Sequence, residues 1–370
     1  MFKQIFLFEL KLWLKKPITY IFFVVFFGLS MLITAAVAGL IGNSSETNAI
    51  INSASSIAEV VSVLNTKIIG LIILITIIAP VVYKDFQYNM HPLLFTKPIS
   101  KFGYLFGRFA AVFLVALFVL FGSVLGHIIT CALPGIEADR LGSFKLMNYI
   151  QPFIYFIIPN TFFIGAIFFS LVTFSRNMLS AYIGAIVLLV LKGISPALLS
   201  NVENEILAAM LDPFGGEAFK AVTKYWSTEE QNTLPIQFSG MLMYNRLLWL
   251  GISMFITVFT YFRFQFSQFN NPVPFFSFRK KKEIKSIPSS PVLSIADIPK
   301  ANQVFSVKFS LYQVFFLSKF EFLKIVKSIF FIIIIILCAL TLTLSTAVFG
   351  ELYGTPTYMV TYQKIGRAHV

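Results

Sequence analysis

The stretch ITYIFFVVFFGLSMLITAAVAGLI, residues 18–41, decides the class of fold, because it carries no charge over the length of a membrane-crossing helix. An α-helix rises about 1.5 Å per residue, so about 20 apolar residues cross the hydrocarbon of a bilayer. Such a segment must be helical, since lipid offers its backbone no hydrogen-bond partner. Ala36-Val37-Ala38 resembles a leader cleavage site. The apolar run exceeds the about 7–15 residues of a leader, so a retained span is favoured over cleavage.

Six further segments have the same character. The chain is 57% hydrophobic and 12% charged, whereas a soluble domain carries roughly a quarter charged residues. The sequence therefore predicts an all-α polytopic integral membrane protein. The further expected spans are 68–82, 109–133, 149–173, 179–199, 247–262 and 329–349, of which the first and fifth are short.

The net charge of +13 raises the question of a nucleic-acid partner, and its distribution argues against one. With a cytoplasmic N-terminus, the inner segments hold 20 basic and five acidic residues. The outer loops hold six basic and eleven acidic residues. Lys and Arg in short loops favour the cytoplasmic side. The excess of basic residues therefore reflects the orientation of the spans, and the lipid bilayer is the expected partner.

Two passages 312 residues apart follow one pattern. Phe8-Glu9-Leu10 and Phe320-Glu321-Phe322 each place an acid on an amphipathic stretch that continues through lysines into a long apolar segment. So long an internal period predicts a duplicated membrane module. We expect one complete half of a two-half protein, followed by the beginning of the second.

The loop between the second and third expected spans, 83–108, is compact and stiff. It begins YKDFQYNMHPLLFTKPISK, residues 83–101. Leu93, Leu94 and Phe95 give a short stretch an apolar side, and Pro98 stops or resets the chain. Ser100 is expected to cap the next helix. From the residues alone, the loop is either a connector that obeys the charge rule or an element coupled to two spans.

The loop resembles that of the permease subunits of type-2 ABC exporters. The matching residues are Asp85-Phe86, Leu93 to Thr96, Pro98 to Lys101 and Gly107-Arg108-Phe109. The resemblance implies an elbow helix at the inner membrane surface, six spans, and a coupling loop that docks on a separate ATPase, which uses the ATP. The elbow would be 3–16, where Glu9, Lys11 and Trp13 follow an interfacial amphipathic pattern. The implied ATPase-coupling residues are Asp85, Phe86, Leu93, Leu94, Phe95, Pro98 and Lys101.

A second set of motifs is similar to a subgroup of large bacterial permeases. It comprises Asp212 to Gly215, Thr223 to Trp226, Gln231 to Thr233 and Tyr244 to Trp249. In that subgroup two permease halves are followed by an extracytoplasmic domain resembling a zinc aminopeptidase. The resemblance implies a bacterial inner-membrane location. Read physically, 200–245 is a lid on the outer ends of the spans or a platform for another domain, and we favour the lid.

These features divide the chain into four parts. Residues 1–266 form the first permease half, 267–316 a Pro-rich cytoplasmic linker with the basic run 279–282, and 317–363 the start of the second half. Residues 364–370, KIGRAHV, read as a translated sequencing adapter. We expect them to be an artefact, and the second permease half to lie in a missing part of the same chain.

The sequence carries neither an ATPase motif nor a zinc-peptidase motif. No phosphate-binding loop ending in Gly-Lys-Ser/Thr and no His-Glu-x-x-His occurs, so catalytic, cofactor and metal residues are not expected. His127 and Lys192 lie inside expected spans. Each is a functional candidate or an ordinary packing residue: a hydrogen-bonded neutral His and a snorkelling Lys. Cys131 and Cys338 are expected to pack rather than pair.

Three functions fit the sequence. The first is a permease of an ATP-driven ABC transporter. The second is an energised scaffold that transmits motion to an extracytoplasmic enzyme domain without transport. The third is a passive anchor for that domain. The substrate and the direction of transport are not encoded in any of these motifs.

Overall fold

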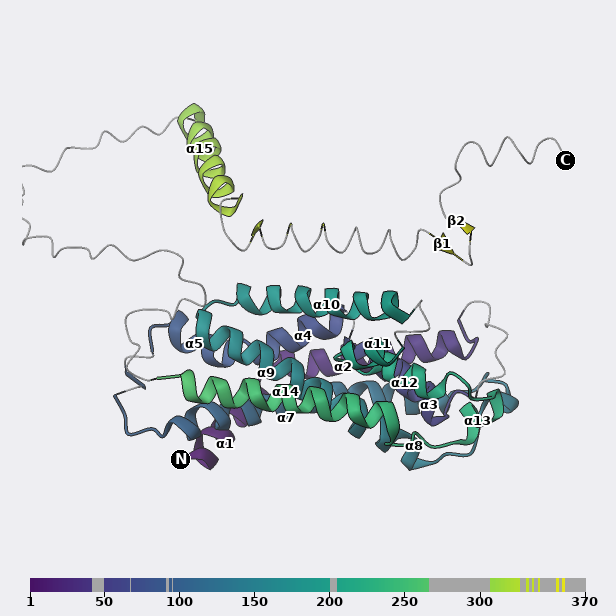
Figure 1. Ribbon diagram of the computed structural model, residues 1–370. Coiled ribbons are helices and arrows are strands. Elements are labelled where there is room, and N and C mark those ends of the chain that lie inside the picture. Colours follow the sequence, from purple (N-terminus) through teal and green to yellow (C-terminus); the bar gives the residue numbers. More distant parts are fainter. Residues whose placement is uncertain are drawn as a thin grey trace, which may run out of the picture.

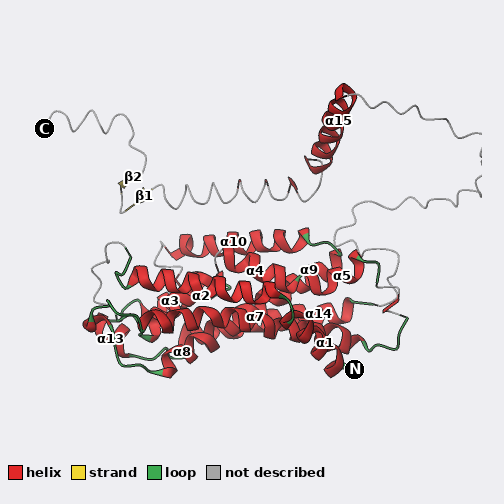
Figure 2. Cartoon of the chain, turned by 180° about the vertical axis from the view of Figure 1, so that it is seen from behind, coloured by secondary structure: helices red, strands yellow, loops and turns green. Residues whose placement is uncertain are grey.

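The computed structural model describes residues 1–41, 50–66, 68–90, 93–94, 96–199, 205–265 and 307–326, with scattered positions between 331 and 356. Up to residue 265, the helices lie side by side along one long axis (Figures 1 and 2). The N-terminus lies at one end of this bundle, which we call the elbow end. Helices α8 and α13 lie at the other, which we call the far end.

The first part of the bundle is built from five helices. They are α1 (Phe2–Leu14), α2 (Pro17–Val37), α3 (Ala54–Thr66), α4 (Ile68–Ile78) and α5 (Pro80–Gln87). Pro17 and Pro80 each stand at the start of a helix, where a missing backbone N–H costs nothing. At Pro80 the chain bends, and the axes of α4 and α5 differ by 48°.

The central helix is α7 (Lys101–Cys131), which packs against α1 and α2. Ser100 caps it as expected, because its hydroxyl accepts a hydrogen bond from the Gly103 N–H at 3.1 Å. After the short turn η1 (Ala138–Arg140), α8 (Leu146–Pro152), the π-helical turn η2 (Phe153–Ile157) and α9 (Ile158–Ser175) follow. Pro152 and Pro159 flank that turn, which accommodates the lost hydrogen bonds without ending the helical run.

The remaining elements of the bundle are two long helices and the three short helices between them. They are α10 (Leu179–Leu199), α11 (Glu205–Leu211), α12 (Gly216–Thr223), α13 (Thr228–Thr233) and α14 (Gly240–Arg263). Helix α15 (Val307–Val326) begins inside the stretch expected to be linker. The strands β1 (Glu351–Leu352) and β2 (Thr355–Pro356) pair antiparallel, a small exception to the all-α expectation.

Four helical segments in the described part are long and apolar enough to cross a membrane. They are α2, α7, the run 146–175 and α14, with a fifth where the bent pair α4–α5 counts as one span. Five of the expected spans are thus helical and suit a multi-pass membrane protein. The expected span 179–199 coincides with α10, whose apolar part Leu179–Lys192 is shorter. The expected span 329–349, the segment 267–306 and the tail 364–370 fall outside the described residues, apart from isolated positions in the first.

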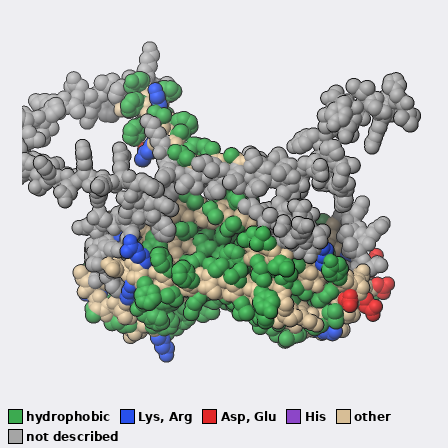
Figure 3. Space-filling view, viewed as in Figure 1, with side chains coloured by type: hydrophobic (Ala, Val, Ile, Leu, Met, Phe, Trp, Pro, Cys, Tyr) green, Lys and Arg blue, Asp and Glu red, His purple; other side chains and the backbone are tan. Residues whose placement is uncertain are grey.

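The core lies where α4, α7 and α9 meet. These helices supply most of the fully buried apolar side chains, among them Leu74, Val112 and Phe168. Helices α2 and α14 bury far less of their surface and keep large apolar side chains exposed. Figure 3 shows a broad hydrophobic area across the middle of one face, with acids gathered at the far end. Glu229 and Glu230 of α13 belong to that end.

Candidate functional site

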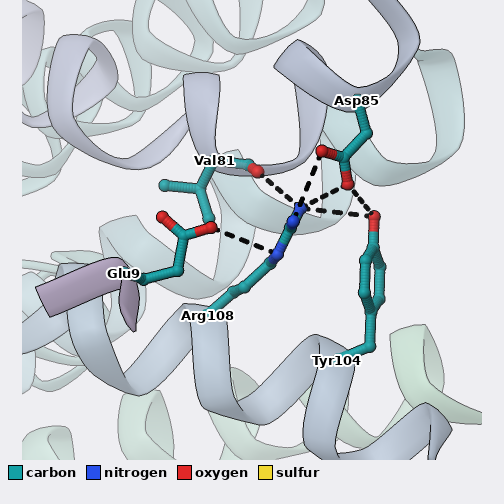
Figure 4. A network of polar contacts seen from close by, with 5 residues as sticks. All are labelled: Glu9, Val81, Asp85, Tyr104 and Arg108. Atoms are coloured by element: carbon teal, nitrogen blue, oxygen red, sulfur yellow. Dashed lines mark hydrogen bonds and ion pairs between the residues drawn. The ribbon is translucent and has the colours of Figure 1, made fainter. Parts of the chain in front are cut away.

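The residue at the centre of the elbow end is Arg108, on the second turn of α7. Its Nη1 forms an ion pair with Asp85 Oδ2, and its Nη2 donates to Asp85 Oδ1 at 3.3 Å. Nη1 also donates to the Val81 carbonyl at 2.9 Å. On its other side, Nε lies 3.3 Å from Glu9 Oε1, an ion pair without the alignment of a hydrogen bond. One guanidinium therefore holds two carboxylates (Figure 4).

Tyr104 completes this cluster. It precedes Arg108 by one helical turn, and its hydroxyl donates to Asp85 Oδ2 at 2.6 Å. Glu9, Asp85, Tyr104 and Arg108 are all buried. They come from α1, α5 and α7, so the cluster joins the elbow helix to both helices that flank the 83–108 loop. We call these four residues the Arg108 cluster.

Burial and charge act in opposite directions on Glu9. Burial raises the pKa of the Glu9 carboxyl above its ordinary value, and the Arg108 guanidinium opposes that rise. Desolvation is therefore the larger effect at this carboxyl, as is usual where an ion pair is taken out of water. The Asp85 carboxylate, by contrast, accepts hydrogen bonds from both Arg108 and Tyr104.

Two further residues of the loop bind helices that lie elsewhere in the sequence. The Arg176 guanidinium, at the end of α9, lies 4.7 Å from the centre of the Phe86 ring. Lys101 Nζ lies 4.7 Å from the Tyr261 ring centre and donates to the Phe262 carbonyl at 3.3 Å, at the end of α14. Through Asp85, Phe86 and Lys101, the loop contacts α7 and the elbow-end termini of α9 and α14.

Between these anchors the loop has an exposed tip. Leu93 is 61% exposed, Leu94 is half-buried, and Lys97 and Pro98 are exposed. Leu93 and Leu94 are helical, and Thr96 Oγ1 donates to the Leu93 carbonyl at 2.9 Å. Phe95, also expected to make coupling contacts, lies outside the described residues. The implied coupling residues thus differ in exposure, because Asp85 is buried within the chain and Leu93 lies at the surface.

The predicted elbow helix is confirmed as a helix with two unlike faces. In α1, Glu9 and Trp13 are buried against the bundle, whereas Lys11 is exposed. The Trp13 carbonyl accepts a hydrogen bond from Thr19 Oγ1 at 2.8 Å, which ties the elbow to the start of α2. The matching acid of the second passage differs, because Glu321 is exposed and pairs with Lys324 at 3.3 Å.

A second buried arginine forms hydrogen bonds between helices near the far end. Arg246 of α14 donates from Nη1 to Asn160 Oδ1 of α9 at 2.7 Å and from Nε to Asn245 Oδ1 at 3.0 Å. Asn245 Nδ2 donates to the Ala209 and Asp212 carbonyls at 2.6 and 2.8 Å. Gly215 has a positive φ of 73°, and a Cβ there would collide with the Arg246 guanidinium. The part of the 200–245 stretch around Asp212 and Gly215 is therefore packed on α9 and α14, which agrees with the lid interpretation. We call this part the lid.

The two polar residues expected inside spans occupy different settings. His127 of α7 is fully buried, with Nδ1 3.6 Å from Cys131 Sγ and its ring against Tyr149 at 5.8 Å. Lys192 is half-buried, and its ammonium lies 5.5 Å from the Phe214 ring centre near the lid. Among the described residues, no group of three His, Cys, Asp or Glu side chains is arranged to hold a metal ion.

Sequence reasoning missed the roles of Tyr104, Arg108 and Arg246. Arg108 was visible as a charge at the membrane entry of a helix, and Asp85 as an opposite charge at the exit of the preceding span. Pairing them in one buried cluster with Glu9 requires the packing of α1 on α7. The spacing of Tyr104 and Arg108 by one turn was the available signal, since such residues share a helix face.

Comparison with protein-family models and with curated proteins finds no match to this chain.

Proposed function

We propose that this chain is the membrane-spanning permease subunit of an ATP-driven ABC transporter of the type-2 exporter class. It lies in a bacterial inner membrane with its N-terminus in the cytoplasm, and α10 completes six spans. A separate ATPase hydrolyses ATP and acts on the 83–108 loop. The resemblance of the loop and elbow to those permeases supplies this class.

The observation that carries the proposal is the set of anchors at the base of the loop. Asp85 binds Arg108, Phe86 contacts Arg176, and Lys101 contacts the end of α14. A force on the exposed tip would therefore reach several helices at once. A buried ion-pair cluster suits this task, because breaking it costs several kcal/mol and it resists partial displacement.

The second function, an energised scaffold for an extracytoplasmic domain, is supported by the far end. The lid is fastened to α9 and α14 through Arg246, Asn160 and Asn245. Motion of those helices would therefore move the lid and any domain docked on it. Reconstitution separates the two functions: ATP-dependent movement of a solute across the vesicle membrane favours the permease.

The direct test of coupling is the variant Leu93→Ala. We expect ATPase association to weaken roughly 30-fold and stimulated hydrolysis to fall, because truncating a packed anchor typically costs about 2 kcal/mol or more. The measurement uses the chain in detergent or vesicles with an ABC ATPase encoded beside its gene. Association is read by binding and hydrolysis by phosphate release.

Leu146→Ala is the matched control. Leu146 is 60% exposed, like Leu93, and lies on α8 at the far end. Its truncation should leave ATPase binding and hydrolysis at the parent level. Wild-type binding and stimulation by Leu93→Ala would contradict the coupling role of the tip.

A further inference from the structure

Two lysines from separate helices share one aromatic ring at the elbow end. Lys16 Nζ, between α1 and α2, lies 3.9 Å from the Trp13 ring centre. Lys84 Nζ, on α5, lies 5.7 Å from the same centre. Trp13 is buried and both lysine side chains are half-buried, so both lysines are partly shielded from water.

The two side chains thus bring their ammonium groups to the same ring. A protonated lysine offers three donors and no acceptor, so two of them repel and cannot bond directly. Burial, and then the neighbouring Lys84, lower the pKa of Lys16 to about 8. An anionic acceptor between the two groups would relieve both effects.

The carboxylates in this region are shared, because Glu9 attracts Lys16 and Lys84 as well as Arg108. Glu9 and Asp85 both face Arg108, which carries a single positive charge. Counting Glu9, Asp85, Arg108, Lys16 and Lys84 leaves one positive charge in excess. One singly charged anion would therefore neutralise the group, and a phosphate diester carries that charge.

We propose that Lys16 and Lys84, over the Trp13 ring, bind the phosphate of an anionic phospholipid headgroup. The position favours a lipid over a free anion. Lys16 directly precedes Pro17, where the apolar helix α2 begins, so the site lies at the boundary between headgroups and hydrocarbon. Tryptophan is enriched at that boundary, and basic residues there attract anionic lipid. This inference requires only a membrane, and does not depend on coupling to an ATPase.

The test measures lysine acetylation, residue by residue, by mass spectrometry. The full chain is placed in nanodiscs of phosphatidylcholine, of phosphatidylcholine with phosphatidylglycerol, or of phosphatidylcholine with inorganic phosphate in the buffer. An uncharged reagent is used near pH 8, where a pKa of about 8 leaves much of Lys16 reactive. Phosphatidylglycerol should slow acetylation of Lys16 at least about tenfold, because a bound anion returns its pKa toward about 10.4.

Lys11 is the internal control, since it is exposed on the same helix and reports the general surface potential. Its rate should change much less than that of Lys16. The variant Lys84→Gln should abolish the selective slowing, whereas Lys15→Gln, at an exposed neighbour, should preserve it. Equal slowing of Lys11 and Lys16 would overturn the site. Equal slowing by inorganic phosphate would overturn the lipid assignment.

Discussion

Arg108 shows how a single side chain can join three separate segments of a membrane protein. Its guanidinium contacts Glu9 from α1, Asp85 and Val81 from the bent helix pair, and Tyr104 from its own helix. Two of these partners are anions, and each depends on Arg108 to offset its burial. The fork of donors on arginine makes this possible, whereas lysine offers a point charge. The residue therefore acts as a positioning residue for the loop.

Replacing Arg108 tests this role. Arg108→Gln should lower the free energy of unfolding by about 3–5 kcal/mol, because it leaves buried carboxylates without a counter-charge. Unfolding in mixed micelles with increasing denaturing detergent measures the change. Lys11→Gln, on the exposed face of α1, is the control and should stay within about 0.5 kcal/mol of the parent. An Arg108→Gln protein as stable as that control would show that the cluster contributes little.

At the scale of elements, glycines on α7 permit close contact with α1 and α2. A Cβ at Gly107 would lie 3.3 Å from Ile5 Cγ2 and from the Phe2 carbonyl oxygen. At Gly122 it would lie 2.6 Å from the Phe23 carbonyl oxygen. Small residues let helix backbones approach in membranes, where dispersion contacts drive packing. Helix α2, which buries little of its surface, therefore depends on this face of α7.

Gly122→Ala should push α2 away from α7. The added methyl meets backbone, which cannot move aside as a side chain does, so we expect a loss of about 1–3 kcal/mol of stability. The same detergent-unfolding assay applies. Gly251→Ala on α14 is the matched control, because nothing lies within 4 Å of a Cβ there. That substitution should be neutral or stabilising, since alanine favours a helix more than glycine. A loss equal in the two variants would rule out the steric explanation.

At the scale of the whole molecule, the two ends of the bundle differ in chemistry. The elbow end contains the Arg108 cluster, the paired lysines and the exposed tip of the loop. The far end contains the lid and loops that are joined across the sequence. Asn52, for example, exchanges two hydrogen bonds with the backbone of Gly142, at 2.7 and 2.8 Å. Ile50 N–H donates to Asn232 Oδ1 at 2.7 Å. We expect a bundle with such unlike ends to take one orientation in a membrane.

Cysteine labelling tests that orientation. In a variant with the native cysteines replaced, a cysteine at Glu229 should react with an impermeant thiol reagent added to intact cells. A cysteine at Lys97 should react only after permeabilisation, because basic residues in short loops stay inside. Both native side chains are exposed, so access to the reagent is not limited by packing. Labelling at Lys97 but not at Glu229 in intact cells would reverse the proposed topology.

The sequence by itself predicted five of the long apolar segments that are helical in the structure, and it also placed the Ser100 cap. These features depend on residues close together along the chain, where hydropathy and capping act locally. Only the tertiary structure decided which charges meet. Asp85 is one of the implied ATPase-coupling residues, and it is buried because α1 and α7 pack together and bring Glu9 and Arg108 beside it. The pairing of Arg246 with Asn160, 86 positions away, likewise depends on α14 lying against α9. A buried charge must find a partner in space, and the energy of that choice is set by helix packing rather than by neighbours in sequence.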